Sequence, residues 1–325
     1  MTAAQKVNNG LKSFNDILSR LIPVIVPAGV VIGFLFPNVF KHLLPYVQLL
    51  FGVITFSGAL KLKATELGAA VKNPLPIVFF FILCHVIMPL VSFGSSILLF
   101  SDPDVIMGFI LLFAGPTAVS GFIWVLIFKG DKALGLTLIL LDTLLAPLIF
   151  PATISILIGA SVTMNMSGVA VSLIFMVVVP TIIGVAVNET SRGKVPAAVC
   201  PYFDPLSKIC LVLVIAANTT VVAPQIRFDD PVIWKMSALC IFLTTTGFLL
   251  SNLHGVIGKY GREKRVSLFV AGGLRNNSAV MTVAVTFFPE AALPAILSIL
   301  FQQTVAAIMG RLLLKKNNEE QPHQE

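Results

Sequence analysis

Gly115-Pro116-Thr117-Ala118-Val119-Ser120-Gly121 interrupts one apolar segment of this chain, and Gly272-Gly273-Leu274-Arg275-Asn276-Asn277-Ser278 interrupts another. Glycine and proline break helices, and the backbone groups that a break sets free cannot be left facing lipid. Both stretches are therefore expected to line protein or water inside an apolar, helical protein. Their positions along the chain decide the fold that the sequence predicts.

Composition places the chain in a membrane. Of its 325 residues, 57% are hydrophobic and only 11% are charged, and its mean hydropathy is +0.96. Soluble domains carry about 25% charged residues, so this sequence cannot build a water-soluble surface. The formal charge of +7 comes from basic residues in short runs between apolar stretches, which fits membrane topology and not a nucleic-acid surface. The four cysteines lack metal-binding spacing, and no metal or cofactor is expected.

Ten segments are of the right length to cross a hydrocarbon core, which takes about 20 helical residues. They lie near 22–39, 43–60, 75–100, 105–128, 133–158, 167–188, 206–225, 233–254, 266–287 and 291–313. The predicted class is an all-α membrane protein. Its predicted parts are a cytoplasmic or interfacial N-terminal segment 1–20, a first five-helix repeat 21–160, a second five-helix repeat 161–314 and a disordered cytoplasmic tail 315–325.

Lys and Arg predict the orientation, because cytoplasmic loops carry an excess of them. The ten-span assignment puts seventeen basic residues on one side, and on the other only Lys41, Arg227 and Lys235. The bias alternates loop by loop, so it also supports the number of spans. We expect a multi-pass protein of the cell membrane with both termini cytoplasmic.

The two interruptions fall in the fourth predicted span of each half. Because each half has an odd number of spans, the halves run in opposite directions, and helices 4 and 9 are expected to be broken and to cross near the midplane. This pattern is typical of inverted-repeat transporters, whose site lies at the midplane between broken helices. Half-helices that begin near Val119 and Ala279 would direct N–H groups and partial positive charge at that point, which favours an anion.

Several motifs, taken in order, resemble the bile acid:sodium symporter family. They are Phe51-Gly52-Val53-Ile54-Thr55-Phe56-Ser57-Gly58-Ala59-Leu60-Lys61-Leu62 with Lys72-Asn73-Pro74, Ile87-Met88-Pro89, Pro116-Thr117-Ala118-Val119-Ser120, Lys129-Gly130-Asp131, Leu144-Leu145-Ala146-Pro147 and Arg275-Asn276-Asn277-Ser278. The resemblance covers most of the chain. It implies a ten-helix inverted-repeat fold and a symporter-like secondary transporter of a small organic anion.

The sequence departs from this family where sodium-coupled members bind their ion. By resemblance, the Ser-Asn pair after the fourth-helix break is replaced here by Gly121 and Phe122. Small hydroxyl residues of the fifth helix align with Gly135 and Ile139, and an acidic residue and a glutamine of the ninth-helix break align with Ala271 and Arg275. Sodium needs a cage of oxygen ligands, so the sodium sites are expected to be lost and transport is expected not to require sodium.

Arg275 and Asp142 are the ionisable residues deepest in the predicted spans. Each lies about ten residues into its helix, which is near the midplane at about 1.5 Å per residue, and charges in a membrane face a partner, a substrate or water. We expect Arg275 to bind the carboxylate of the substrate or to stand where sodium binds in relatives. A structural ion pair with Asp142 is the alternative. Asp142 is the candidate coupling-ion residue, with a proton or sodium as the ion.

The other candidate substrate-binding residues are polar side chains near the interruptions. His85 of the third span is expected either to line the same cavity or to be a packed histidine, and Gln302 is a further polar lining residue. The remaining candidates are Asn276, Asn277, Ser278, Thr117, Ser120 and Gln303.

An enzyme is not expected, because the sequence has neither an H-E-x-x-H nor a G-x-S-x-G motif. Three alternatives stay open: a receptor or sensor that binds without transport, an auxin-efflux-like carrier, and an arsenite carrier. The last typically has cysteine at the fourth-helix break, whereas Ala114-Gly115-Pro116-Thr117 offers no thiol. The expected partners are a small organic anion, a coupling ion and the lipid bilayer.

Overall fold

The computed structural model describes residues 3–63, 74–159 and 165–314. Within these ranges the regular structure is helical, and the only extended pairing is an isolated antiparallel bridge between Thr117 and Arg275.

The first half of the chain consists of apolar helices. They are α1 (Ala3–Leu35), α2 (Pro37–Phe40), the 3-10 helix η1 (Lys41–Tyr46), α3 (Val47–Ala59), α5 (Leu75–Ile82), the π-helical turn η2 (Leu83–Ile87), α6 (Met88–Leu99), α7 (Pro103–Ala114), α8 (Gly121–Ile127) and α9 (Lys132–Ile158).

The second half has the same character. It contains α10 (Met166–Leu173), the π-helical turn η3 (Ile174–Val178), α11 (Val179–Thr190), α12 (Lys194–Val222), the 3-10 helix η4 (Ala223–Gln225), α13 (Pro231–Ile257), α14 (Arg262–Gly273), α15 (Asn277–Phe287), the 3-10 helix η5 (Pro289–Ala291) and α16 (Leu293–Leu313).

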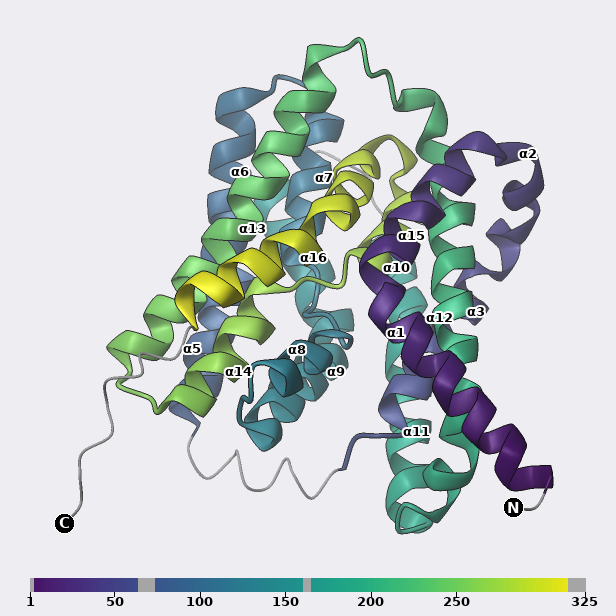
Figure 1. The fold of residues 1–325 in the computed structure, drawn as a ribbon. Coiled ribbons are helices and arrows are strands. Elements are labelled where there is room, and N and C mark those ends of the chain that lie inside the picture. Colours follow the sequence, from purple (N-terminus) through teal and green to yellow (C-terminus); the bar gives the residue numbers. More distant parts are fainter. Residues whose placement is uncertain (1–2, 64–73, 160–164, 315–325) are drawn as a thin grey trace.

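The helices form two groups that lie side by side (Figure 1). In one group, α12 packs against α1, α3 and α11. In the other, α13 packs against α6, α14 and α16, and α9 packs against α7, α8 and α14. α15 contacts α12 of the first group as well as α7 and α16 of the second. The interrupted segments therefore lie where the two groups meet.

Two helices widen into a π turn directly before a proline. Proline lacks an N–H and its ring clashes with the carbonyl four residues earlier, and Pro89 and Pro180 follow η2 and η3 by two residues. A local π turn is one adjustment that accommodates a proline in a membrane helix, and π turns are frequent at functional sites. Here η2 carries His85.

A basic residue in the left-handed region follows each of three helices, two residues after the helix ends. Lys129, Arg192 and Lys259 have φ of 56°, 51° and 51°, a conformation that costs roughly 1–2 kcal/mol outside glycine. The turns that contain them, after α8, α11 and α13, all lie at the same end of the molecule (Figure 1). A positive charge complements the carbonyl end of each helix and supplies the loop charge on which the predicted orientation rests.

Seven helices in the described ranges are long and apolar enough to cross a membrane. They are Pro37–Ala59, Leu75–Leu99, Lys132–Ile158, Met166–Thr190, Lys194–Gln225, Pro231–Ile257 and Pro289–Leu313, and an eighth is obtained if the bent pair Ser13–Ser19 and Val24–Leu35 is one span. Pro103–Ala114 and Asn277–Phe287 are shorter apolar helices. A multi-pass, all-helical membrane protein is thereby confirmed, while the count of ten stays a prediction.

Some predicted boundaries differ from the observed ones. The predicted seventh span covers 206–225, but α12 begins at Lys194; the prediction is too short because Pro201 and Pro205, which usually break a helix, lie inside it. The predicted N-terminal segment 1–20 stays a prediction: α1 runs from Ala3 to Leu35, and its parts Ser13–Ser19 and Val24–Leu35 are bent by 75° relative to each other. The predicted division at 160/161 and the predicted tail 315–325 fall outside the described residues.

α1 and α12 approach so closely that only glycine fits at their contact. A Cβ atom added to Gly33 would lie 2.8 Å from Ala216 Cα and 2.9 Å from its carbonyl carbon. Both obstacles are backbone atoms, which cannot rotate away. Close backbone approach at small residues is the usual way in which membrane helices gain packing energy.

The Gly33→Ala variant is expected to lose about 1–3 kcal/mol of stability, as overpacked sites do. Gly94→Ala is the matched control, because a Cβ atom there has nothing within 4 Å and alanine favours a helix over glycine. Thermal unfolding of the detergent-purified protein measures both variants. Equal melting temperatures for the two would contradict the close contact between α1 and α12.

Candidate functional site

The two interrupted segments pair with each other through their backbones. Helix α7 ends at Ala114 and α8 begins at Gly121, while α14 ends at Gly273 and α15 begins at Asn277. Between them, Ala118 N–H donates to Leu274 O at 3.1 Å, and Asn276 N–H donates to Pro116 O at 2.8 Å. This short antiparallel contact satisfies backbone groups that no helix serves, as a low-dielectric interior requires.

Side chains accept hydrogen bonds from the two residues of the bridge. Thr117 N–H donates to Asp142 Oδ2 at 2.7 Å, and Arg275 N–H donates to Gln302 Oε1 at 3.0 Å. The Gln302 amide donates in return to Arg275 O at 2.9 Å. One residue from α9 and one from α16 thus fix the two partners of the bridge.

Asp142 is fully buried and holds a second partner. Its Oδ1 lies 2.7 Å from His85 Nε2, on the π turn η2, and the other imidazole nitrogen has no hydrogen-bond partner in the described structure. The predicted alternative of an ion pair between Asp142 and Arg275 is not observed among the described residues, whose ion pairs are Lys61–Asp204, His85–Asp142 and Arg227–Asp229. His85 takes the position that the alternative assigned to Arg275.

The Arg275 guanidinium is buried within the crossing, with the residue only 2% exposed. Its Nη1 donates to Gly115 O at 3.4 Å, its Nη2 has no hydrogen-bond partner, and the Cys84 thiol is a further neighbour. A guanidinium is always charged, so a fixed positive charge lies between the broken helices.

A cavity of about 390 Å³ adjoins the crossing. That volume suits a small organic molecule. Helices α1, α3 and α12 line it on one side, and residues 118–123, 275–278 and α16 line it on the other. It therefore lies between the two helix groups, where a relative movement of the groups would open or close it.

The structure divides the predicted site residues into two sets. Six of them line the cavity: Ser120, Arg275, Asn276, Asn277, Ser278 and Gln303. The other three, His85, Thr117 and Asp142, are absent from its lining and lie behind it in the crossing, joined to one another by hydrogen bonds.

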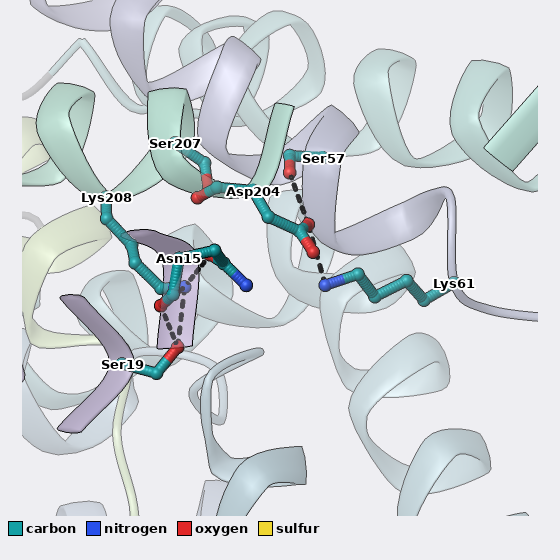
Figure 2. Close-up of polar contacts among 7 residues, drawn as sticks. All are labelled: Asn15, Ser19, Ser57, Lys61, Asp204, Ser207 and Lys208. Carbon is teal, nitrogen blue, oxygen red and sulfur yellow. Dashed lines mark hydrogen bonds and ion pairs between the residues drawn. The ribbon is translucent and has the colours of Figure 1, made fainter. Parts of the chain in front are cut away.

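Sequence reasoning missed three charged residues that line the cavity, Lys61, Asp204 and Lys208. Lys61 Nζ lies 2.7 Å from Asp204 Oδ1, and Lys208 Nζ bonds to Ser19 and Asn15 of α1 (Figure 2). Asp204 and Lys208 are one turn apart on α12, and ionisable residues inside a membrane helix are themselves a functional signal. The late start assigned to this helix placed Asp204 outside it.

Apolar groups surround the positions where sodium ligands were expected. A side chain at Gly121 would meet Leu274 Cδ1 at 3.4 Å and Val270 Cγ1 at 3.5 Å. One at Gly135 would meet the Val125 methyl groups at 3.2 Å and a single oxygen, Ser267 Oγ, at 3.6 Å. Ile139 and Ala271 are each 1% exposed. The Thr117 hydroxyl already bonds to the carbonyls of Ala271 and Leu274.

The comparisons with known proteins agree with this architecture. YbaS of Bacillus subtilis (strain 168), an uncharacterized protein, is 38% identical over 297 residues, which cover 90% of this chain and 96% of YbaS. YocS of the same organism, named an uncharacterized sodium-dependent transporter, is 25% identical over 293 residues and 90% of each chain. BASS1 of Arabidopsis thaliana, named a probable chloroplastic sodium/metabolite cotransporter, is 23% identical over 298 residues, 91% of this chain and 73% of its own. Residues 47–227 match the Sodium Bile acid symporter family, and the chain belongs to that family.

Proposed function

We propose that this membrane protein is a secondary transporter that moves a small organic anion across the cell membrane. The observation that carries the proposal is the charge of the cavity, which is lined by Lys61, Lys208 and Arg275 against a single carboxylate, Asp204. An excess of positive charge in a low-dielectric cleft favours an anion. Family membership and the transporter names given to YocS and BASS1 support transport over binding alone.

The transporter has ten spans in two inverted repeats, with α7–α8 and α14–α15 as the broken fourth and ninth. The matched roles of Asp142 and Gln302 support this arrangement, since each satisfies the N–H of a bridge partner in the preceding broken span of its own half. The packing of α7 on α16 and of α14 on α9 is likewise reciprocal. Relative movement of the two helix groups gives alternating access to the cavity.

Both termini are cytoplasmic in this proposal. The basic turns after α8, α11 and α13 lie at one end of the molecule, and the connections from α6 to α7 and from α12 to α13 lie at the other (Figure 1). Positive charge marks the cytoplasmic side.

The substrate lies against Ser120, Gln303 and the start of α15. Arg275 lines this wall but directs a donor to Gly115 O, so its role is that of an internal cation whose field attracts the anion. By the resemblance to sodium-coupled carriers, Arg275 aligns with a residue that helps to bind the ion in those proteins. Asn276 accepts the Ala279 N–H at 3.2 Å and so orders the beginning of α15.

The transporter does not need sodium, and Asp142 is the coupling residue. Apolar side chains flank Gly121 and Gly135, which leaves few oxygen ligands for the ion. Asp142 and His85 form a buried acid–base pair, and such pairs serve as proton relays in transporters. Thr117 N–H holds the carboxylate in place, and Arg275 is the bridge partner of Thr117.

Arg275→Gln is expected to weaken binding of an organic acid by about 1–3 kcal/mol, because a charged group is lost from a buried site. Arg275→Lys should be less harmful, since it keeps the charge. Isothermal titration calorimetry with acids found in a thermal-shift screen measures the change, and Arg227→Gln is the control, because its side chain is 72% exposed and paired only with Asp229. Unchanged affinity together with loss of folded protein would assign Arg275 to the fold alone.

Replacing sodium by choline at constant ionic strength is expected to leave binding and uptake of the acid unchanged. The physical reason is the apolar lining of the aligned positions. Saturable dependence on sodium would contradict this and would show that the ion is held elsewhere, for example by backbone carbonyls.

Asp142→Asn is expected to abolish proton movement with the substrate, because the amide cannot release a proton. Proteoliposomes with an internal pH dye and an imposed substrate gradient report this directly. Acidification that persists in Asp142→Asn would exclude Asp142 as the proton carrier, and reconstituted yield controls for folding.

A further inference from the structure

We infer that Asn218 and Thr282 form a latch that joins the two helix groups on the extracellular side of the crossing, and that release of this latch opens the cavity to the outside. The inference rests on the proposed alternating access and adds the residues that control it. Neither residue is among the described residues that line the cavity. Both therefore position the helices and do not touch the transported molecule.

The cavity lies between the crossing and the end of the molecule that carries the basic turns. Lys61 lines it, and the adjacent Leu62 carbonyl accepts a hydrogen bond at 2.8 Å from the side chain of Asn188, close to the basic turn after α11. Asp204, which also lines the cavity, lies in the first half of α12, and α12 begins directly after that turn. The cavity thus extends toward the cytoplasmic side in the proposed topology.

On the other side of the crossing, a buried hydrogen bond joins the two helix groups. The Asn218 side-chain amide on α12 donates to the Thr282 hydroxyl on α15 at 3.0 Å, and both residues are 1% exposed. α12 belongs to one group, while α15 follows the crossing and packs on α7 and α16 of the other. Asn218 lies in the last two turns of α12, toward the connection to α13 at the end opposite the basic turns (Figure 1).

The surroundings of the latch are apolar. Buried side chains of both helices form one cluster here: Val214 and Val222 of α12, and Ala279, Met281 and Val283 of α15. A buried amide that loses its partner in such surroundings costs more free energy than one hydrogen bond contributes. The bond between Asn218 and Thr282 therefore favours the closed arrangement, and water replaces it only when the two helix groups separate.

A second contact between the groups lies further along the same side. Gln225, in η4 after α12, donates to the Pro289 carbonyl and to the Glu290 carboxylate of η5, both at 3.3 Å. These bonds are exposed, so water competes for them and their net contribution is small. The closed side thus continues to the end of the molecule, and the buried bond of the latch is its main polar contact.

The latch lies one helical turn from the cavity. The Thr282 hydroxyl accepts from Asn218 and donates in turn to the Ser278 carbonyl at 2.9 Å. Ser278 lines the cavity at the start of α15. A shift of this first turn of α15 would change the separation of Asn218 and Thr282, so a ligand bound there can bias the latch through its different affinity for the two arrangements.

A cysteine introduced by Val222→Cys reports whether the extracellular side is open. Val222 is fully buried and lies one turn after Asn218 on the same face of α12. The full-length protein in detergent, with the partly buried Cys200 replaced by serine, is treated with a charged methanethiosulfonate, and mass spectrometry follows labelling at position 222 and at native Cys240. Cys240 is buried within one helix group against the Pro294 carbonyl, so its labelling detects a loosened fold.

Thr282→Val removes the acceptor and leaves the Asn218 amide unpaired in the closed arrangement. Labelling at position 222 should therefore become at least about fivefold faster, as the net contribution of one buried hydrogen bond implies. Asn218→Leu should act in the same direction, and Thr282→Ser, which keeps the hydroxyl, should retain the wild-type rate. Thr219→Val is the matched control, because this buried hydroxyl neighbours Asn218 but bonds to the Ile215 carbonyl within α12.

Three outcomes would overturn the inference. Wild-type labelling rates in both Thr282→Val and Asn218→Leu would show that the bond does not keep the extracellular side closed. Faster labelling of Cys240 in the same variants, or an equal effect of Thr219→Val, would assign these residues to the stability of the fold alone. The assay needs no substrate, so absence of substrate counterflow in the wild-type protein would instead contradict the proposed function.

Discussion

The fold depends on the pairing of two extended segments in the middle of an apolar protein. Residues 115–120 and 274–276 interrupt helices, and an interruption in lipid-facing protein is tolerated only when each freed N–H and C=O finds a partner. Here the N–H of Ala118 and that of Asn276 bond across the crossing, while Asp142 and Gln302 accept the N–H groups of Thr117 and Arg275. The first role of the polar residues at the centre is therefore to satisfy the backbone of the two interrupted segments.

The same arrangement separates two kinds of charge. Within the crossing, Arg275 lines the cavity and donates to the Gly115 carbonyl, while the His85–Asp142 pair lies behind the cavity. On the cavity wall, Lys61, Asp204 and Lys208 belong to the opposite helix group and are partly exposed. In the proposed function, an anion bound between them would contact both groups at once, so that its binding would be coupled to their relative position.

Much of this could be predicted from the sequence. Glycine and proline at residues 115–121 and 272–278 identified the interruptions because backbone chemistry is local, and hydropathy located the helices. The pairing of Asp142 with His85 instead of Arg275 could not be predicted, since it depends on the π turn before Pro89 and on how α9 is rotated. The hydrogen bond from Arg275 to the Gly115 carbonyl could not be predicted either, because every residue carries a backbone carbonyl. The contacts of Asp204 with Lys61 and of Lys208 with Ser19 could not be predicted either, because each joins segments that are distant in the sequence.

The central claim is that the cavity carries an organic anion through the membrane, and counterflow tests it most directly. Proteoliposomes loaded with an unlabelled acid that binds the purified protein are diluted into the same acid in labelled form. The account predicts transient accumulation of label above the equilibrium level, and its loss when Arg275 and Lys208 are both made neutral. Saturable binding by the reconstituted wild-type protein without any counterflow would contradict the account and would identify a receptor that does not transport.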